Sequence, residues 1–297
     1  MSKNDMEHEI EQRSKKNSQF REVWRRLKKN KPAVAGLLVL MILSLMAVFA
    51  DVIADYDEVV IRQDRTVRLQ PPSGRFWFGT DAFGRDVFAR IVHGARISLT
   101  IGLATTSISV LIGGLIGAAL AYWGGIPDII FMRFCDIMSC IPVMLMALAI
   151  VTALGPSMIN LMIAIIFVNI PLYIRFVRST VLTIVDMDYI EAARACGTGN
   201  FRIIRKHILV NVTGPIIVQA TLSIAGMILT AAALSFLGLG IAPPRPEWGS
   251  MLSDSRQFMR LAPYLMVFPG IAIVISALSF NLLGDGLRDA LDPRLKS

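Results

Sequence analysis

Long charge-free stretches of apolar residues alternate with polar segments along this chain. The stretches cover 33–50, 97–127, 137–174, 208–244 and 261–284. A helix needs about twenty apolar residues to cross a bilayer, and each stretch reaches or nearly reaches that length. The third is too long for one span and is interrupted at 154–157 by Leu-Gly-Pro-Ser, which is a turn signal. The pattern therefore predicts six membrane-spanning helices.

The predicted spans divide the chain into a basic N-terminal segment, 1–31, and one transmembrane domain, 32–297. Two of the polar segments between spans are long, namely 54–95 and 177–212. No internal repeat and no soluble second domain are visible in the sequence. The expected fold class is an all-α polytopic membrane protein. Its spans are expected at about 33–53, 96–122, 128–153, 157–176, 214–237 and 264–283.

Positive charge is distributed unevenly around these spans. The chain has 30 Lys and Arg residues against 22 Asp and Glu, which gives a formal net charge of +8. Ten of the basic residues precede Pro32, and all eight lysines fall in segments on the same predicted side of the membrane as the N-terminus. Because basic residues mark cytoplasmic segments, we expect both termini and 177–212 in the cytoplasm, and 54–95 outside. This distribution argues against nucleic-acid binding as the reason for the net charge.

Several polar or small residues lie within the predicted spans. Gly113 and Gly117 fit a small-xxx-small packing face, and Pro142 is expected to kink the third span. Arg133 and Asp136 are spaced for a local ion pair on one helix. Asparagines at membrane depth are expected to form hydrogen bonds between helices, with a role in a substrate path as the alternative. These asparagines are Asn160, Asn169 and Asn281.

The segment 177–212, called the island below, is predicted to contain two helices. Glu191 to Cys196 is rich in helix-forming residues, and Gly197-Thr-Gly-Asn is a helix stop followed by a new start. A left-handed backbone is expected at Gly197. Small residues, Ala192 and Ala193, let the surface of another protein approach closely. The first half of the island is therefore predicted to be a helix that ends in an elbow.

The second helix of the island has two distinct faces. Phe201, Ile204 and Ile208 fall on one apolar stripe at helical spacing. A second face is basic and consists of Arg202, Arg205 and Lys206. Such an island has to lie in water, where it is well placed to meet a soluble partner. The alternative is a solvated loop that binds nothing.

The order of residues in the island resembles the cytoplasmic "EAA" loop of ATP-binding-cassette (ABC) importer permeases. The similarity rests on Glu191-Ala-Ala, then Gly197, then Ile208-Leu. In the external segment, 78–86 resembles the FGTD-x-x-GRD signature of the dipeptide/oligopeptide/nickel permease family. The matching residues are Gly79, Thr80, Asp81, Gly84, Arg85 and Asp86. Glu247-Trp-Gly and the C-terminal end are also similar to that family, and the resemblance extends from Phe20 onward.

This resemblance implies the type I ABC importer permease fold and the C-type subunit of a two-permease heterodimer. The implied partners are a second homologous permease, two ATPase subunits, an extracytoplasmic solute-binding protein and membrane lipid. ATP and Mg are then bound by the ATPase subunits, and this chain holds no cofactor. The implied location is the bacterial or archaeal cytoplasmic (inner) membrane. The implied substrates are di- or oligopeptides, with nickel chelates or glutathione-like peptides as the alternative.

The resemblance also implies roles for residues of the island. The contact that couples transport to the ATPase falls on Glu191, Ala192, Ala193 and Gly197. The basic residues Arg202, Arg205 and Lys206 are expected to pair either with ATPase carboxylates or with anionic lipid.

One position departs from the family pattern, because Leu209 is followed by Val210 where the family has a proline. Without that proline, the second island helix is expected to run on into the fifth span as far as Pro215.

Other classes of protein lack support in the sequence. No Gly-Lys dipeptide, H-E-x-x-H or G-x-S-x-G occurs, so the chain has no P-loop and no common hydrolase motif. His93 and His207 lie apart from carboxylates and cysteines at metal-ligand spacing. A membrane-embedded enzyme needs a polar catalytic pair in two spans. A channel or secondary transporter usually shows charges within spans or inverted repeats. We therefore predict a transport subunit that is not an enzyme.

Overall fold

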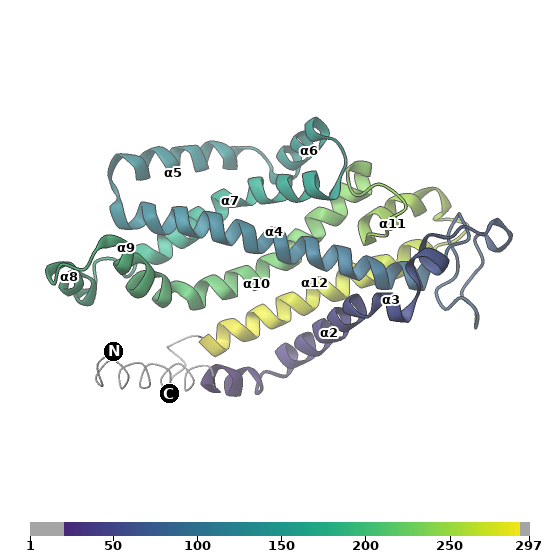
Figure 1. The fold of residues 1–297 in the computed structure, drawn as a ribbon, viewed down its shortest axis with the longest axis horizontal. Helices are drawn as coiled ribbons and strands as arrows, with labels where there is room; N and C mark the ends of the chain where they lie inside the picture. Colours follow the sequence, from purple (N-terminus) through teal and green to yellow (C-terminus); the bar gives the residue numbers. More distant parts are fainter. Residues whose placement is uncertain (1–20, 292–297) are drawn as a thin grey trace.

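The computed structural model describes residues 21–291, which fold mainly into helices that run along one long axis (Figure 1). Within this range the β structure is a single bridge between Thr80 and Asp86. Residues 21–27 are also helical. The α-helices that follow are α2 (Lys31–Val48), α3 (Ala50–Ile53), α4 (Val87–Trp123), α5 (Gly125–Cys140), α6 (Val143–Leu154), α7 (Met158–Leu182), α8 (Asp188–Ala195), α9 (Asn200–Ile203), α10 (Leu209–Leu234), α11 (Trp248–Ser255) and α12 (Tyr264–Leu291).

Five helical stretches among residues 21–291 are long and apolar enough to cross a membrane. They are α2, α4, α7, the run Asn200–Leu239 and α12. The predicted third span is broken, because α5 and α6 meet at a bend of 88°. Ile141 has the extended backbone that a residue before proline prefers, and Pro142 cannot continue the preceding helix. Counted as one crossing, α5 and α6 complete the six spans.

α4 begins earlier than the apolar pattern indicates. Its first residue is Val87, whereas the apolar pattern predicts a second span from about residue 96. The Asp86 carboxylate accepts hydrogen bonds from the backbone N–H groups of Phe88 (2.8 Å) and Ala89 (3.3 Å). This N-cap starts the helix, which therefore extends beyond the apolar stretch.

α4 packs against α7, α10 and α2. A Cβ at Gly117 would lie 2.5 Å from the Ile174 carbonyl oxygen, and one at Gly113 would lie 2.7 Å from the Tyr173 Cβ. α4 and α7 approach this closely because both positions lack a side chain. The structure therefore confirms the predicted packing face.

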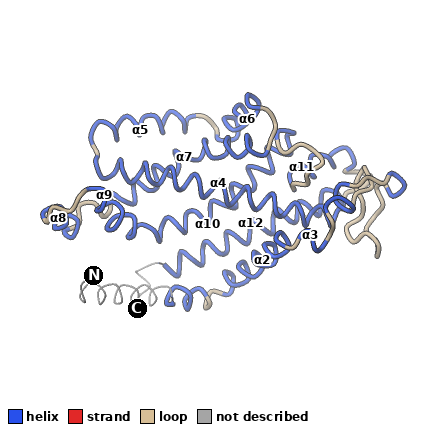
Figure 2. The backbone as a smooth tube through the Cα atoms, viewed as in Figure 1, coloured by secondary structure: helices blue, strands red, loops and turns tan. Residues whose placement is uncertain are grey.

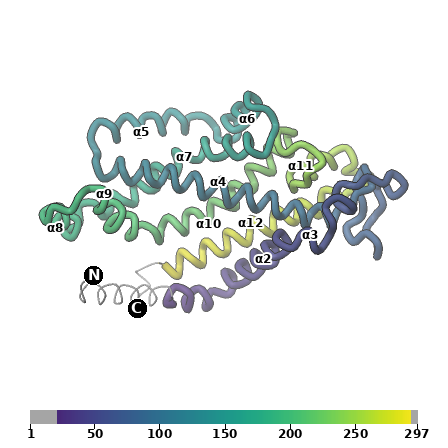
Figure 3. The backbone as a smooth tube through the Cα atoms, viewed as in Figure 1, coloured from purple at the N-terminus to yellow at the C-terminus, as the bar shows by residue number. Residues whose placement is uncertain are grey.

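The two ends of the bundle carry different polar structures (Figures 2 and 3). α8 and α9 project at one end, and the start of α2 and the end of α12 lie toward it. α11 and the loops that precede α4 lie at the other end. The island and the external signature are therefore separated along the bundle, as the six-span pattern requires.

Candidate functional site

The island forms the predicted helix–elbow–helix at one end of the bundle. α8 carries Glu191, and α9 continues through a π-helical turn, Ile204–Ile208, into α10. The helix passes through Val210 without a break, as expected in the absence of a proline there. It does not end at Pro215, which lies inside α10.

Gly197 ends α8 in the left-handed conformation, with φ of +73°. The Thr198 N–H donates to the Ala193 carbonyl oxygen (3.1 Å), and the Gly197 N–H donates to that of Arg194 (2.9 Å). These bonds form a Schellman motif, in which glycine adopts the left-handed conformation without strain. A Cβ at Gly197 would meet no atom within 4 Å. The backbone angle, and not crowding, therefore favours glycine here.

Buried isoleucines attach the island to the bundle. Ile190, Ile203 and Ile208 are fully buried. They pack in one cluster with Val177 and Val181 from α7. The two island helices consequently move with α7 and α10 and not as a free loop.

Polar contacts reinforce this attachment at the end of α4. The Tyr122 hydroxyl donates to the side-chain oxygen of Asn200 (2.9 Å). The Arg194 guanidinium lies 4.8 Å from the centre of the Tyr122 ring, within the range of a cation–π contact. Tyr122 therefore links α4 to both α8 and α9.

The outward surface of the island is mixed in character. Glu191, Ala192 and Gly197 are exposed, whereas Ala193 is half-buried against the isoleucine cluster. The basic side chains of the second helix are exposed, and they make no ion pair within residues 21–291. These are Arg202, Arg205 and Lys206.

Phe201 lies in a position that helical spacing does not predict. The apolar stripe predicts that Phe201 is buried, but its side chain is 77% exposed. Ile203 is buried instead. The π-helical turn aligns residues five apart, so that Ile203 and Ile208 share the buried side. Aromatic and arginine side chains are enriched in protein–protein contacts, so an exposed ring next to Arg202 is typical of such a surface. Phe201 is therefore a candidate contact residue, although the sequence pattern places it on the buried face.

The external signature residues lie together at the other end of the molecule. Thr80 is fully buried, and its hydroxyl accepts a hydrogen bond from the Gln70 N–H (2.9 Å). Gly79 and Gly84 have φ of +78° and +77°. A Cβ at Gly84 would lie 1.8 Å from the Asp64 carbonyl oxygen. Both glycines are therefore required by the tight path of this loop.

Asp81 organises the rest of the signature. One carboxylate oxygen accepts the backbone N–H groups of Phe83 (2.8 Å) and Arg85 (3.0 Å), and the other pairs with Arg85 Nε (2.7 Å). The Tyr264 hydroxyl of α12 donates to the Thr80 carbonyl oxygen (3.1 Å). The signature thus ties the external loop to α4 and α12. Asp81 and Arg85 also line a cavity of about 810 Å³.

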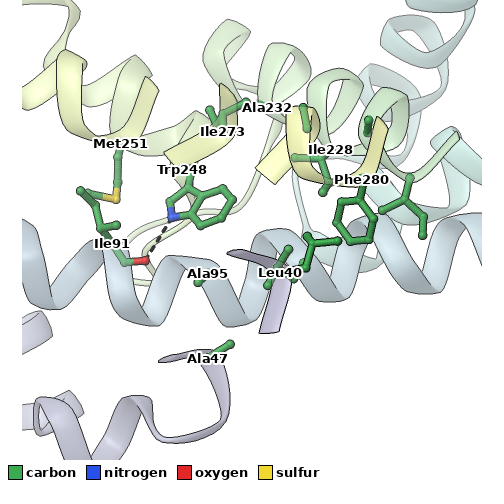
Figure 4. Close-up of a cluster of buried hydrophobic side chains, with 14 of the residues drawn as sticks. Leu40, Ala47, Ile91, Ala95, Ile228, Ala232, Trp248, Met251, Ile273 and Phe280 are labelled. Atoms are coloured by element: carbon green, nitrogen blue, oxygen red, sulfur yellow. Dashed lines mark hydrogen bonds between the residues drawn. The ribbon is translucent and has the colours of Figure 1, made fainter. Parts of the chain in front are cut away.

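Buried hydrogen bonds fix the start of α11, and one of them lies within the apolar cluster that Figure 4 shows. Trp248 is fully buried, and its indole N–H donates to the Ile91 carbonyl oxygen (3.1 Å). Glu247 is also buried and accepts the N–H groups of Gly249 and Ser250, both at 2.8 Å. Burial raises the pKa of the Glu247 carboxyl. The family-like Glu247-Trp-Gly sequence therefore attaches α11 to α4.

The other polar residues singled out in the sequence have local partners. Arg133 and Asp136 form the predicted ion pair, at 3.7 Å. The Asn160 amide donates to two carbonyl oxygens at the end of α6 (2.9 and 3.0 Å), and the Asn169 amide donates within its own helix (2.8 Å). The expected bond between helices is therefore confirmed for Asn160, which joins α7 to the end of α6, and is wrong for Asn169. In the described part of the chain, no group of three or more His, Cys, Asp or Glu is placed to hold a metal ion.

Comparison with known proteins covers nearly the whole chain. The family described as binding-protein-dependent transport system inner membrane component matches residues 109–297. The N-terminal transmembrane domain of oligopeptide transport permease C matches residues 18–72.

Several relatives are similar along more than nine-tenths of their length. The dipeptide transport system permease protein DppC of Alkalihalophilus pseudofirmus is 49% identical over 94% of this chain and 91% of its own. The di/tripeptide transport system permease protein DppC of Pseudomonas aeruginosa is 44% identical over 94% of both chains. The glutathione transport system permease protein GsiD of Pectobacterium atrosepticum is 42% identical over 94% of this chain and 92% of its own.

A solved structure shows the same fold. A chain from inward-facing conformations of the MetNI methionine ABC transporter aligns with 69% of this chain and 97% of itself, with a TM-score of 0.56 and 18% identity. The chain therefore belongs to the family of binding-protein-dependent transport system inner membrane components, as a multi-pass permease subunit of a bacterial ABC importer that is not itself the ATPase.

Proposed function

We propose that this chain is the C-type transmembrane subunit of an importer of di- or oligopeptides. Two relatives are described as dipeptide and di/tripeptide permeases, which supports the peptide substrate. A second homologous permease completes the pathway, a solute-binding protein delivers the peptide outside, and two ATPase subunits bind ATP and Mg. The island couples this chain to one of those ATPase subunits.

The observation that carries the coupling role is the rigid attachment of the island. Its buried isoleucines and its Schellman turn hold α8 and α9 on the ends of the spans. A displacement of the exposed surface is therefore passed to α7 and α10 and is not absorbed by a loop. On this surface Glu191, Ala192 and Gly197 form the contact, and Phe201 is its aromatic anchor. Closure of the ATPase dimer on ATP then moves the island and alternates access to the pathway.

We infer further that both termini and the island lie in the cytoplasm, with α5 and α6 together forming the third of six crossings. Two observations support this topology. The island and the external signature lie at opposite ends of the bundle (Figure 1). All eight lysines fall in segments that six crossings place inside.

Uptake into liposomes that hold the complete importer tests the substrate and the class. With ATP inside and the solute-binding protein outside, we expect a labelled dipeptide to accumulate and to stimulate ATP hydrolysis. Glutathione is the second candidate, because several relatives that are 42% identical are described as glutathione permeases. Uptake of glutathione or a nickel chelate without dipeptides would contradict the peptide assignment. The absence of any ATP-dependent uptake would contradict the importer itself.

A further inference from the structure

A basic cavity lies at the end of the bundle that carries the island. It occupies about 330 Å³ between the helical segment 21–27, the two residues that directly precede α2 and the end of α12. Its polar lining consists of Arg25, Arg26, Lys29, Asn30 and Asp289. This cavity is remote from the external signature and plays no part in the coupling contact described above.

The charges that line the cavity do not cancel. Arg26 is paired with Glu22 at 2.6 Å. Asp289 accepts a hydrogen bond from the Asn30 amide at 3.2 Å. Arg25 and Lys29 are exposed and form no ion pair within residues 21–291. The lining of the cavity is therefore net positive, with two cationic donors available to an anion.

The cavity lies next to a cluster of packed apolar side chains that fixes the positions of its basic residues. Leu27 is 5% exposed and packs with Ala33 and Ala290. A Cβ at Gly286 would lie 2.2 Å from the Ala33 Cβ, so the start of α2 and the end of α12 are in close contact. The three chain segments around the cavity are thus held in one geometry.

Trp24 indicates the level of this cavity relative to the membrane. Its side chain is 41% exposed, and the Lys28 ammonium lies 5.2 Å from the centre of its ring. Exposed tryptophan together with Lys and Arg is typical of a helix that lies in the membrane–water interface. The apolar span α2 begins directly after this segment, at Lys31. The cavity therefore opens where lipid headgroups are found.

We propose that this cavity binds the phosphodiester headgroup of an anionic phospholipid in the cytoplasmic leaflet. Arg25 and Lys29 donate hydrogen bonds to the phosphate oxygens. Because donor and acceptor are both charged, these bonds are stronger than hydrogen bonds between neutral groups. The acyl chains then lie along exposed apolar side chains of α2, among them Leu38 and Met41. Basic residues next to a span attract anionic lipids on this side of the membrane. The leaflet assignment rests on the proposed topology.

Native mass spectrometry of the purified complete importer tests the site. The importer is exchanged into detergent that contains either phosphatidylglycerol, which is anionic, or phosphatidylcholine, which has no net charge. The double variant Arg25→Gln/Lys29→Gln is compared with Arg21→Gln/Lys31→Gln, which removes two charges from the same segment outside the cavity. We expect retained phosphatidylglycerol in the unaltered protein and the control, and retention at least about tenfold weaker in the cavity variant.

Three results would overturn the headgroup site. They are equal retention of the two lipids, equal loss in both double variants, and displacement of the lipid by millimolar inorganic phosphate, which would indicate a site for free phosphate. ATPase subunits that remain bound in the same spectra report assembly separately. Failure of lipid binding with the ATPase retained counts only against the lipid site. Unaltered protein that never carries an ATPase counts against the proposed function instead.

Discussion

Single glycines set the backbone at both polar ends of this permease. Gly197 in the island and Gly84 in the external signature have similar positive φ angles, +73° and +77°. Their surroundings differ, because a Cβ at Gly197 points into open space and one at Gly84 would collide with the Asp64 backbone. Substitution at the first position therefore tests backbone conformation, and substitution at the second tests conformation and crowding together.

We expect Gly197→Ala to weaken coupling while membrane insertion stays normal. An L-residue in the left-handed conformation costs about 1–2 kcal/mol, which favours a different end for α8. Peptide-stimulated ATP hydrolysis of the reconstituted importer should fall severalfold. The matched control is Gly199→Ala, where φ is −61° and a Cβ also meets nothing within 4 Å. Equal activity of the two variants would show that coupling does not need the left-handed turn.

We expect Gly84→Ala to destabilise the external end. Overpacking at such a contact costs about 1–3 kcal/mol, in addition to the strain of a positive φ. Thermal unfolding of the purified protein should show a lower Tm than for Gly74→Ala, which has neither a close neighbour nor a positive φ. An unchanged Tm in Gly84→Ala would mean that the tight loop around Asp64 does not contribute to stability.

At the scale of helices, the apolar pattern predicts the number of crossings but not their ends. Length and the absence of charge are enough to recognise a span, whereas a window of hydropathy does not register a single cap such as Asp86. A hydropathy window also does not show how sharply a proline bends a span. At Pro142 the expected kink is a break of 88°, because Ile141 before the proline has an extended backbone. The exposure of Phe201 depends on a π-helical turn, for which the sequence has no clear signal.

The exposed ring of Phe201 should anchor the contact with the ATPase. Truncation of an aromatic anchor typically costs about 2 kcal/mol or more, which corresponds to roughly 30-fold in affinity. We expect Phe201→Ala to weaken binding of the purified ATPase to the permease pair in nanodiscs by about that factor. Phe131→Ala, at a ring on α5 that is 41% exposed, is the control. If both variants bind the ATPase as tightly as the unaltered protein, Phe201 is not an anchor.

At the scale of the whole molecule, the chain is a bundle with a projecting island at one end and a tightly tied loop at the other. Charge and spacing could predict the existence of both structures, and the family resemblance could predict their residues. Which of these residues face outward, and which hold the structure together, could be learned only from the three-dimensional structure. Ala193 turns toward the isoleucine cluster while Ala192 faces outward. Asp81 joins its own loop to Leu69, whose N–H donates to the Asp81 carbonyl oxygen (3.1 Å), and to Arg90 of α4, whose Nε lies 3.6 Å from the carboxylate.

The proposed topology predicts which positions can be labelled from outside the cell. In a background without cysteines, membrane-impermeant thiol reagents should modify Ser73→Cys and Gln257→Cys in intact cells. They should modify Thr198→Cys only after the cells are lysed, and a permeant reagent should reach all three. Labelling of Thr198→Cys in intact cells would place the island outside and exclude contact with a cytoplasmic ATPase.

The most direct test of the central claim is the amount of ATPase that stays with the permease when the island surface is enlarged. Ala192 is the position of choice, since it is exposed, whereas Ala193 packs partly inside. Overpacking a contact by about 1–3 kcal/mol weakens association roughly 5- to 150-fold. Ala192→Trp should therefore lose its ATPase during purification while the two permeases stay together, and Ala242→Trp, at an exposed position toward the other end, should keep it. Retention of the ATPase at normal stoichiometry by Ala192→Trp, with normal transport, would contradict the coupling role of the island.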